Sequence, residues 1–175
     1  MTKKLIILLI ASIINNYCIA QTVLMNGVAA ERPLTWDDFV GEPDPASPHD
    51  AYIYWNIRYR FQPTFVGDSI KIKPEVVLEL SNKSWVKQHK KTKDLLKHEQ
   101  GHFDIGLLCA QQITKALEQR TFTKENMSAE VAKTFKEILE EYRRLERAYD
   151  ADTGHSQYRK QQKKWDILLA ERLLQ

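Results

Sequence analysis

The residues with the clearest chemical potential are His98, Glu99 and His102, which form the pattern H-E-x-x-H. Residues four apart lie on the same face of an α-helix, so the two imidazoles can bind one metal ion. A carboxylate beside the first histidine can take a proton from a metal-bound water molecule without binding the metal. Zinc lowers the pKa of such a water molecule to about 7. The pattern therefore predicts one zinc ion per chain, two of its ligands, and Glu99 as general base.

The sequence around the motif predicts the helix that this chemistry needs. Thr92 is a good N-cap, with Asp94 in the first turn. Apolar residues then recur at intervals of three and four, which indicates an amphipathic helix: Leu95, Leu96, Leu107, Leu108, Ile113 and Leu117. The competing interpretation is a pair of solvated histidines on an ordinary helix.

The third zinc ligand is not close to the motif in sequence. Catalytic zinc usually takes three protein ligands and leaves one position for water. The positions at which extended forms of the motif carry the third ligand hold Leu108 and Phe122 here. The polar segment 150–155 follows a long predicted helix and includes a glycine and several residues able to bind metal. We expect His155 to be the third ligand, with Asp150 as the alternative.

Other polar residues near the motif keep two interpretations each. Asp104 either accepts a hydrogen bond from a ligand histidine or lies exposed on its helix. Tyr149 either stabilises an oxyanion or ends an apolar stripe as a core residue. Trp36 and Asp38 have no evident role, and a core tryptophan and a turn aspartate are the simplest interpretations. Three acidic residues of the second helix are further candidates for the third ligand, although a solvated face is the expected interpretation: Glu137, Glu140 and Glu141.

Residues 1–20 have the pattern of a signal peptide. Two lysines precede an apolar run that is too short for a membrane span of about 20 residues. Small residues end the segment at Ala20, as a cleavage site requires. A lipidated Cys18 is the alternative. We expect an exported protein, periplasmic or secreted, in which residues 21–175 form a single metallopeptidase-like domain.

Charge and cysteine content narrow the function further. The chain has a formal net charge of +3, which falls to +1 without residues 1–20 because that segment carries two lysines and no acidic residue. This balance argues against a nucleic-acid partner. Cleavage also leaves Cys109 without an intramolecular partner, so we expect no disulfide framework. Within its apolar helix, Cys109 is expected to be a small core residue.

Before the motif, residue patterns predict strands. Apolar and polar residues alternate in 51–61 and again in 70–80, with a turn at Gly67-Asp68 between them. Pro74 indicates an edge position or a break in the second strand, and 22–30 is expected to add a short strand.

After the motif, residue patterns predict two further helices. One has Ser128 as its N-cap and ends near Tyr149, and a polar loop then leads to a last helix from Gln157. The expected fold class is α+β and zincin-like. An N-terminal antiparallel sheet packs on a helical second half that carries the H-E-x-x-H helix.

Four segments resemble a bacterial family of unknown function whose members are described as predicted secreted zinc-dependent proteases. The resemblance covers about residues 32–166 and rests on these segments: Leu34–Phe39, Ser84–Lys87, Leu95–Ile105 and Tyr149–His155. It implies export and zinc binding through the histidines already named. The proteolytic activity of the family is itself inferred from the motif.

Three functional hypotheses follow. The first is an exported zinc metallopeptidase that holds a peptide or protein substrate in extended form along a strand of the sheet. The second is a non-catalytic module of the cell envelope in which zinc stabilises the fold, and a closed set of four ligands would favour it. The third is hydrolysis of a non-peptide amide, such as a cell-wall crosslink. The sequence specifies neither the substrate nor the oligomeric state.

Overall fold

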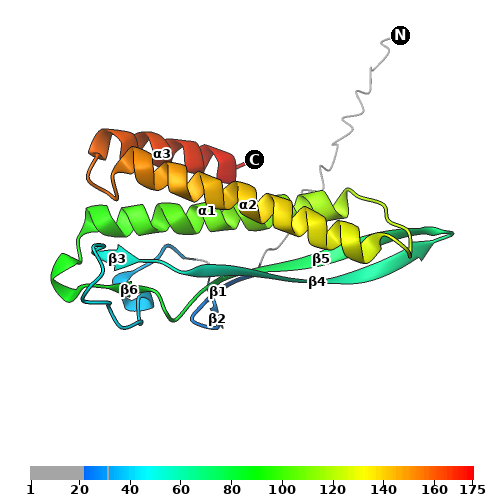
Figure 1. Ribbon diagram of the computed structural model, residues 1–175, viewed down its shortest axis with the longest axis horizontal. Helices are drawn as coiled ribbons and strands as arrows, with labels where there is room; N and C mark the ends of the chain where they lie inside the picture. The colour runs from blue at the N-terminus through cyan, green and yellow to red at the C-terminus, as the bar shows by residue number, and fades with distance from the viewer. Residues whose placement is uncertain (1–21, 31) are drawn as a thin grey trace, which may run out of the picture.

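The computed structural model describes residues 22–30 and 32–175. The signal peptide and the Cys18 alternative lie outside these residues. The chain forms an α+β fold in which α1 (Lys93–Glu118) covers one face of a long, narrow sheet and two further helices pack on α1 (Figure 1). These two helices are α2 (Met127–Thr153) and α3 (Arg159–Leu173). In the described part of the chain, no helix is long and apolar enough to cross a membrane.

The main sheet has four strands in the order β2-β1-β5-β4. Its strands are β1 (Thr22–Met25), β2 (Val28–Ala29), β4 (Trp55–Val66) and β5 (Ser69–Leu80). Every second residue of β5 is buried under the helices, as the alternating pattern predicts. A separate small sheet pairs β3 (Ala51–Tyr52) with β6 (Trp85–Val86).

The expectation of an antiparallel sheet is wrong for one pair of strands, because β1 runs parallel to β5. The other two pairs, β1 with β2 and β4 with β5, are antiparallel. Both are joined by tight turns that contain a glycine with positive φ, Gly27 and Gly67. Such turns force antiparallel pairing. No tight turn joins β1 to β5, so local turn signals could not specify its direction.

One detail of the strands differs from the sequence pattern, and Pro74 meets the edge alternative of its prediction. The run 51–61 does not form one strand. Ile53 and Tyr54 lie outside the strands and separate β3 from β4, and β4 extends to Val66. Pro74 lies inside an unbroken β5, opposite Phe61 of β4. The pairing of β1 covers only Val77–Leu80, so β5 has no β1 neighbour at the proline.

α1 lies between the sheet and the other two helices (Figure 1). Thr92 caps it as predicted, since its side chain accepts a hydrogen bond from the backbone N–H of Leu95. Gly106 allows a close approach to the sheet, because a Cβ atom there would lie 2.9 Å from the ring of Trp55. Cys109 is fully buried, and burial raises the pKa of its thiol to about 12, which keeps it protonated.

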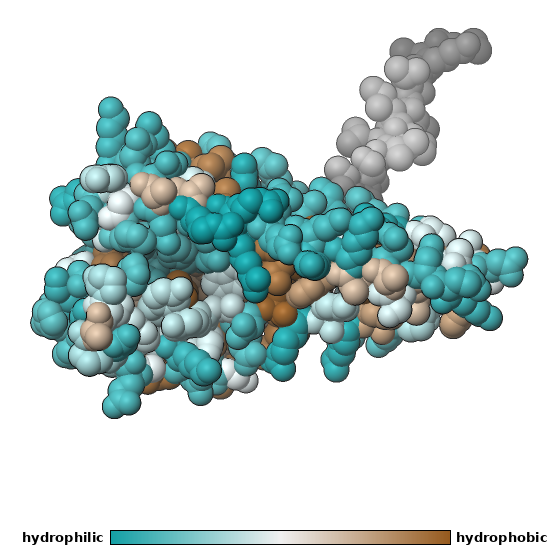
Figure 2. Space-filling view, in the orientation of Figure 1, coloured by the Kyte–Doolittle hydropathy of each residue, from teal (hydrophilic) through white to brown (hydrophobic). Residues whose placement is uncertain are grey.

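The predicted bounds of α2 need correction. The helix begins at Met127 after Asn126 and continues to Thr153, so Asp150 lies in its last turn and not in a loop. The apolar stripe stops near Tyr149, but Tyr149 and Thr153 are both fully buried, and this packing extends the helix. The visible face of the helices is mostly hydrophilic, and apolar side chains are exposed where the helices meet the sheet and in a smaller patch on the upper helices (Figure 2).

Candidate metal centre

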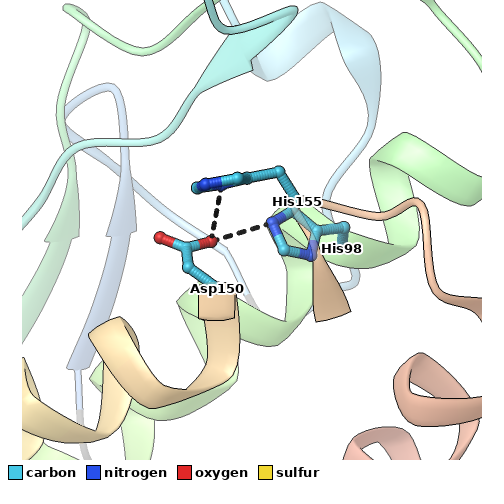
Figure 3. Close-up of side chains that lie close together, drawn as sticks. All are labelled: His98, Asp150 and His155. Atoms are coloured by element: carbon cyan, nitrogen blue, oxygen red, sulfur yellow. Dashed lines mark ion pairs between the residues drawn. The ribbon is translucent and has the colours of Figure 1, made fainter. Parts of the chain in front are cut away.

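Three imidazole nitrogens converge on one carboxylate oxygen. Asp150 Oδ1 lies 3.2 Å from His98 Nε2, 3.0 Å from His102 Nε2 and 3.2 Å from His155 Nδ1. Figure 3 shows two of these contacts, with the rings of His98 and His155 turned toward the carboxylate. The ligand atoms of His98, Asp150 and His155 all lie within 4.8 Å of one another, and His102 joins them through Asp150. The structure thus brings together the three predicted ligands and the alternative ligand.

This set of donors suits zinc. Imidazole nitrogen and carboxylate oxygen are both ligands that zinc takes in proteins. His98 and His102 are buried, and His155 is about half exposed, so the group lies where the protein interior opens to solvent. No other group of three potential ligand side chains comes as close together in the part of the chain that the structure describes.

The end of α2 brings His155 to this position. Gly154, His155 and Ser156 all have positive φ, at 56°, 51° and 78°. The backbone N–H of His155 also donates to the carbonyl of Asp150 at 3.3 Å, which turns the chain back over the last helical turn. Two successive non-glycine residues with left-handed backbone carry a conformational cost, which is often found at functional sites.

Glu99 is buried in the cleft wall beside the histidines, with 4% of its surface exposed. Within the described residues, its carboxylate makes no hydrogen bond or ion pair. Burial raises the pKa of Glu99 to about 7, although the nearby His102 opposes this change. A carboxylate that has no hydrogen-bond partner among the described residues and a pKa near neutrality is suited to accepting and returning a proton at physiological pH.

A carboxylate that sequence reasoning missed orients His102. Glu146 of α2 accepts hydrogen bonds through one oxygen from Trp55 Nε1 at 2.9 Å and from His102 Nδ1 at 3.3 Å. Burial disfavours a charged His102, but its hydrogen bonds to Asp150 and Glu146 outweigh burial and raise its pKa to about 10. Burial would likewise raise the pKa of Asp150, yet its hydrogen bonds to His102 and His98 hold it well below the usual range.

Asp104 and Tyr149 make contacts of a structural kind. Asp104 accepts a hydrogen bond from Gln100 Nε2 at 2.7 Å, and Gln100 Oε1 in turn accepts one from the backbone N–H of Leu34. Among the described residues Asp104 bonds to no ligand histidine, and its pair with Gln100 ties the N-terminal segment to the motif helix. The fully buried Tyr149 donates its hydroxyl proton to the carbonyl of His98 at 3.0 Å, which directs it away from the cleft.

The buried ring of Tyr149 accounts for Gly101. A Cβ atom at position 101 would lie 2.6 Å from Cζ of Tyr149, so only glycine leaves room for this ring.

In the N-terminal segment, Asp38 is buried and stabilises the short helical turn Trp36–Asp38. Its carboxylate accepts from the backbone N–H of Thr35 and pairs with Arg32.

The donor group lies in the wall of an open cleft of about 900 Å³. One wall is the segment Pro48–Ile57, and the other is formed by α1 and α2. β4 is the outermost strand of its sheet, and its first residues, Trp55–Ile57, line this cleft. Both the candidate ligand side chains and the first residues of an outer strand therefore line the same space.

The chain belongs to a family described as "Bacterial protein of unknown function (DUF922)", whose model matches residues 32–156. The matched region includes His98, His102, Asp150 and His155, and it ends before α3. No curated protein and no solved structure matches the chain.

Proposed function

We propose that this member of the family is an exported zinc-dependent hydrolase with a zincin-like fold, and that it cleaves peptide bonds. His98, His102 and His155 bind one zinc ion, and Glu99 is the general base. The observation that carries the proposal is the position of Glu99: a buried carboxylate without a partner among the described residues lies beside three converging imidazoles in the wall of an open cleft.

The residues of the site have distinct tasks. Zinc, when bound, supplies a Lewis acid that polarises a carbonyl group and lowers the pKa of water to about 7. Glu99 takes a proton from the attacking water and returns it to the leaving amine nitrogen. Glu146 and Trp55 hold His102 in its orientation, and this fixes the direction of the metal-binding nitrogen.

The free edge of β4 supports an extended peptide as substrate. An outer strand presents unpaired backbone N–H and C=O groups, and a peptide can pair with them as one more strand. The first residues of this outer strand, Trp55–Ile57, line the same cleft as Asp150. Backbone pairing would place a substrate carbonyl in the cleft whatever the side chains of the substrate peptide are.

One observation favours a second function. Asp150 Oδ1 lies among the three imidazoles, so Asp150 is positioned to complete a closed set of four ligands. A site of that kind would bind zinc without leaving a position for water, and the protein would then be a zinc-stabilised binding or structural module of the cell envelope. Glu99 argues for catalysis, because its carboxylate lies in the cleft wall without a partner among the described residues, and a closed structural site has no use for such a group.

The test combines metal analysis with hydrolysis of an unfolded protein substrate by residues 21–175. We expect one zinc per chain and slow, chelator-sensitive cleavage. Glu99→Gln should keep the zinc and lower turnover by about 10²-fold or more, the scale of general-base loss. A wild-type protein that binds zinc but cleaves nothing, with an identical Glu99→Gln variant, would establish the structural module instead. A wild-type protein that binds no zinc would refute both.

A further inference from the structure

We propose that Gln162 of α3 is a positioning residue of the metal centre, which holds His98 with its proton on Nδ1 and leaves Nε2 free to bind the metal. The proposal rests on the proposed zinc site. It concerns a part of the chain that the family match does not reach, since the match ends at residue 156 and α3 begins at Arg159.

Two hydrogen bonds fix the orientation of the Gln162 amide. Its Nε2 atom lies 2.7 Å from the hydroxyl oxygen of Tyr149 and 2.9 Å from Oδ1 of Asp166. The Tyr149 hydroxyl already donates its proton to the carbonyl of His98, and a carboxylate only accepts. Both neighbours therefore need a donor, so the NH₂ group of Gln162 faces them and Oε1 faces the other way.

That orientation places an acceptor beside His98 Nδ1, which keeps the proton on this nitrogen when Nε2 binds zinc. Gln162 Oε1 lies 3.2 Å from His98 Nδ1 and can only accept a hydrogen bond. Thr153 Oγ1, 3.4 Å from the same nitrogen, donates its own proton to the carbonyl of Tyr149 and so also acts toward His98 as an acceptor. A neutral imidazole with its proton on Nδ1 has a free lone pair on Nε2. Nε2 is the atom that faces Asp150 Oδ1, at 3.2 Å, and its contact with this carboxylate gives way to zinc when the metal binds.

The contacts around Gln162 hold it firmly in place. Its side chain is buried, with 7% of the residue exposed. Asp166, which binds its NH₂ group, also pairs with Lys97 of α1 at 2.6 Å, and Lys97 directly precedes His98. Two contacts therefore join α3 to the motif helix: Gln162 with His98, and Asp166 with Lys97. Partners of this kind typically contribute 10–100-fold to metal affinity.

The test is a double-mutant cycle on zinc affinity, measured by competition with a chelator. Gln162→Met keeps the size of the side chain and removes its hydrogen bonds, and the adjacent Gln161→Met on the exposed face of α3 is the matched control. We expect Gln162→Met to weaken zinc binding by about 10–100-fold and Gln161→Met to leave it unchanged. In a His98→Ala background, Gln162→Met should have no further effect, because its partner is gone.

Each other outcome has a definite meaning. Equal weakening with and without His98 would show that Gln162 acts through the fold, and unchanged affinity would overturn the positioning role while the zinc site stands. A wild-type protein that binds no zinc would refute the proposed function itself. If Gln162→Met does not fold, proton NMR of the zinc-loaded wild type decides: a slowly exchanging Nδ1–H signal, absent in His98→Ala, is expected, and rapid exchange with water would overturn the proposal.

Discussion

Asp150 Oδ1 lies 3.2 Å from His155 Nδ1, although the carboxylate belongs to the last turn of α2 and the imidazole follows the residue that ends this helix. The left-handed backbone at Gly154 and His155 folds the loop back over the helix and creates the contact. The two candidates for the third zinc ligand therefore occupy the same place. Substitution separates their roles.

We expect His155→Ala to weaken zinc binding by orders of magnitude, as His98→Ala should, because each removes one of three ligands. Asp150→Asn should cost only about 10–100-fold, the range for a partner that orients ligands. A chelator-competition titration of the three variants makes the comparison. If Asp150→Asn strips the metal and His155→Ala does not, Asp150 is the ligand and the assignment is reversed.

Glu146 should affect zinc through His102. Glu146→Gln removes the charge from the oxygen that accepts the hydrogen bonds of both His102 Nδ1 and Trp55 Nε1. We expect zinc affinity to fall by about 10–100-fold with no change in the folded structure. Glu141→Gln, an exposed position on the same helix, is the control and should bind zinc as the wild type does. Identical affinities for the two variants would exclude an orienting role for Glu146.

Gly101→Ala should destabilise the protein despite the better helix propensity of alanine. The new methyl group would lie 2.6 Å from Cζ of the fully buried Tyr149. Overpacking of this kind typically costs about 1–3 kcal/mol, against a gain of about 1 kcal/mol from propensity. Urea unfolding should therefore show a lower midpoint, whereas Gln112→Ala on the exposed side of α1 should be nearly neutral. A higher midpoint for Gly101→Ala would contradict the packing argument.

The sequence predicted the parts of the site that depend on local spacing. His98, Glu99 and His102 share one helical face, and Thr92 caps the helix, because both features are set within a few residues. The partners of the histidines could not be found in this way. Glu146 is 44 residues from His102, and Gln162 is 64 residues from His98, so only the packing of α2 and α3 on α1 brings them together.

The placement of Asp150 shows the same limit. In sequence, the apolar stripe ends near Tyr149 and polar residues follow, a pattern typical of a loop. In the structure, Thr153 is fully buried and donates to the carbonyl of Tyr149, and the helix continues to it. A helical Asp150 points its carboxylate at α1. The alternating burial of β5 was predictable because successive side chains of a strand point to opposite faces of the sheet, so the local residue pattern alone shows which face is buried.

Asp38 gives a prediction that is independent of metal. Its carboxylate accepts hydrogen bonds from Arg32 and from the Thr35 backbone, and these bonds, Arg32 first, hold its pKa below the usual range against the effect of burial. A depressed pKa in the folded state stabilises the protein above the pKa of the unfolded chain, and the stabilisation is lost as pH falls through the folded-state value. Asp38→Asn should therefore lower the free energy of unfolding at pH 7 by about 1–3 kcal/mol.

This difference should shrink as the pH falls below about 4, where the carboxyl group of the unfolded wild type is protonated. Urea titrations of metal-free wild type and Asp38→Asn at several pH values measure it. The neighbouring Asp37 is exposed, so Asp37→Asn should match the wild type at every pH. The difference in free energy of unfolding between wild type and Asp38→Asn could instead stay constant from pH 7 to pH 3. The stabilisation would then not depend on the charge of Asp38, and the ion pair with Arg32 would contribute nothing to it.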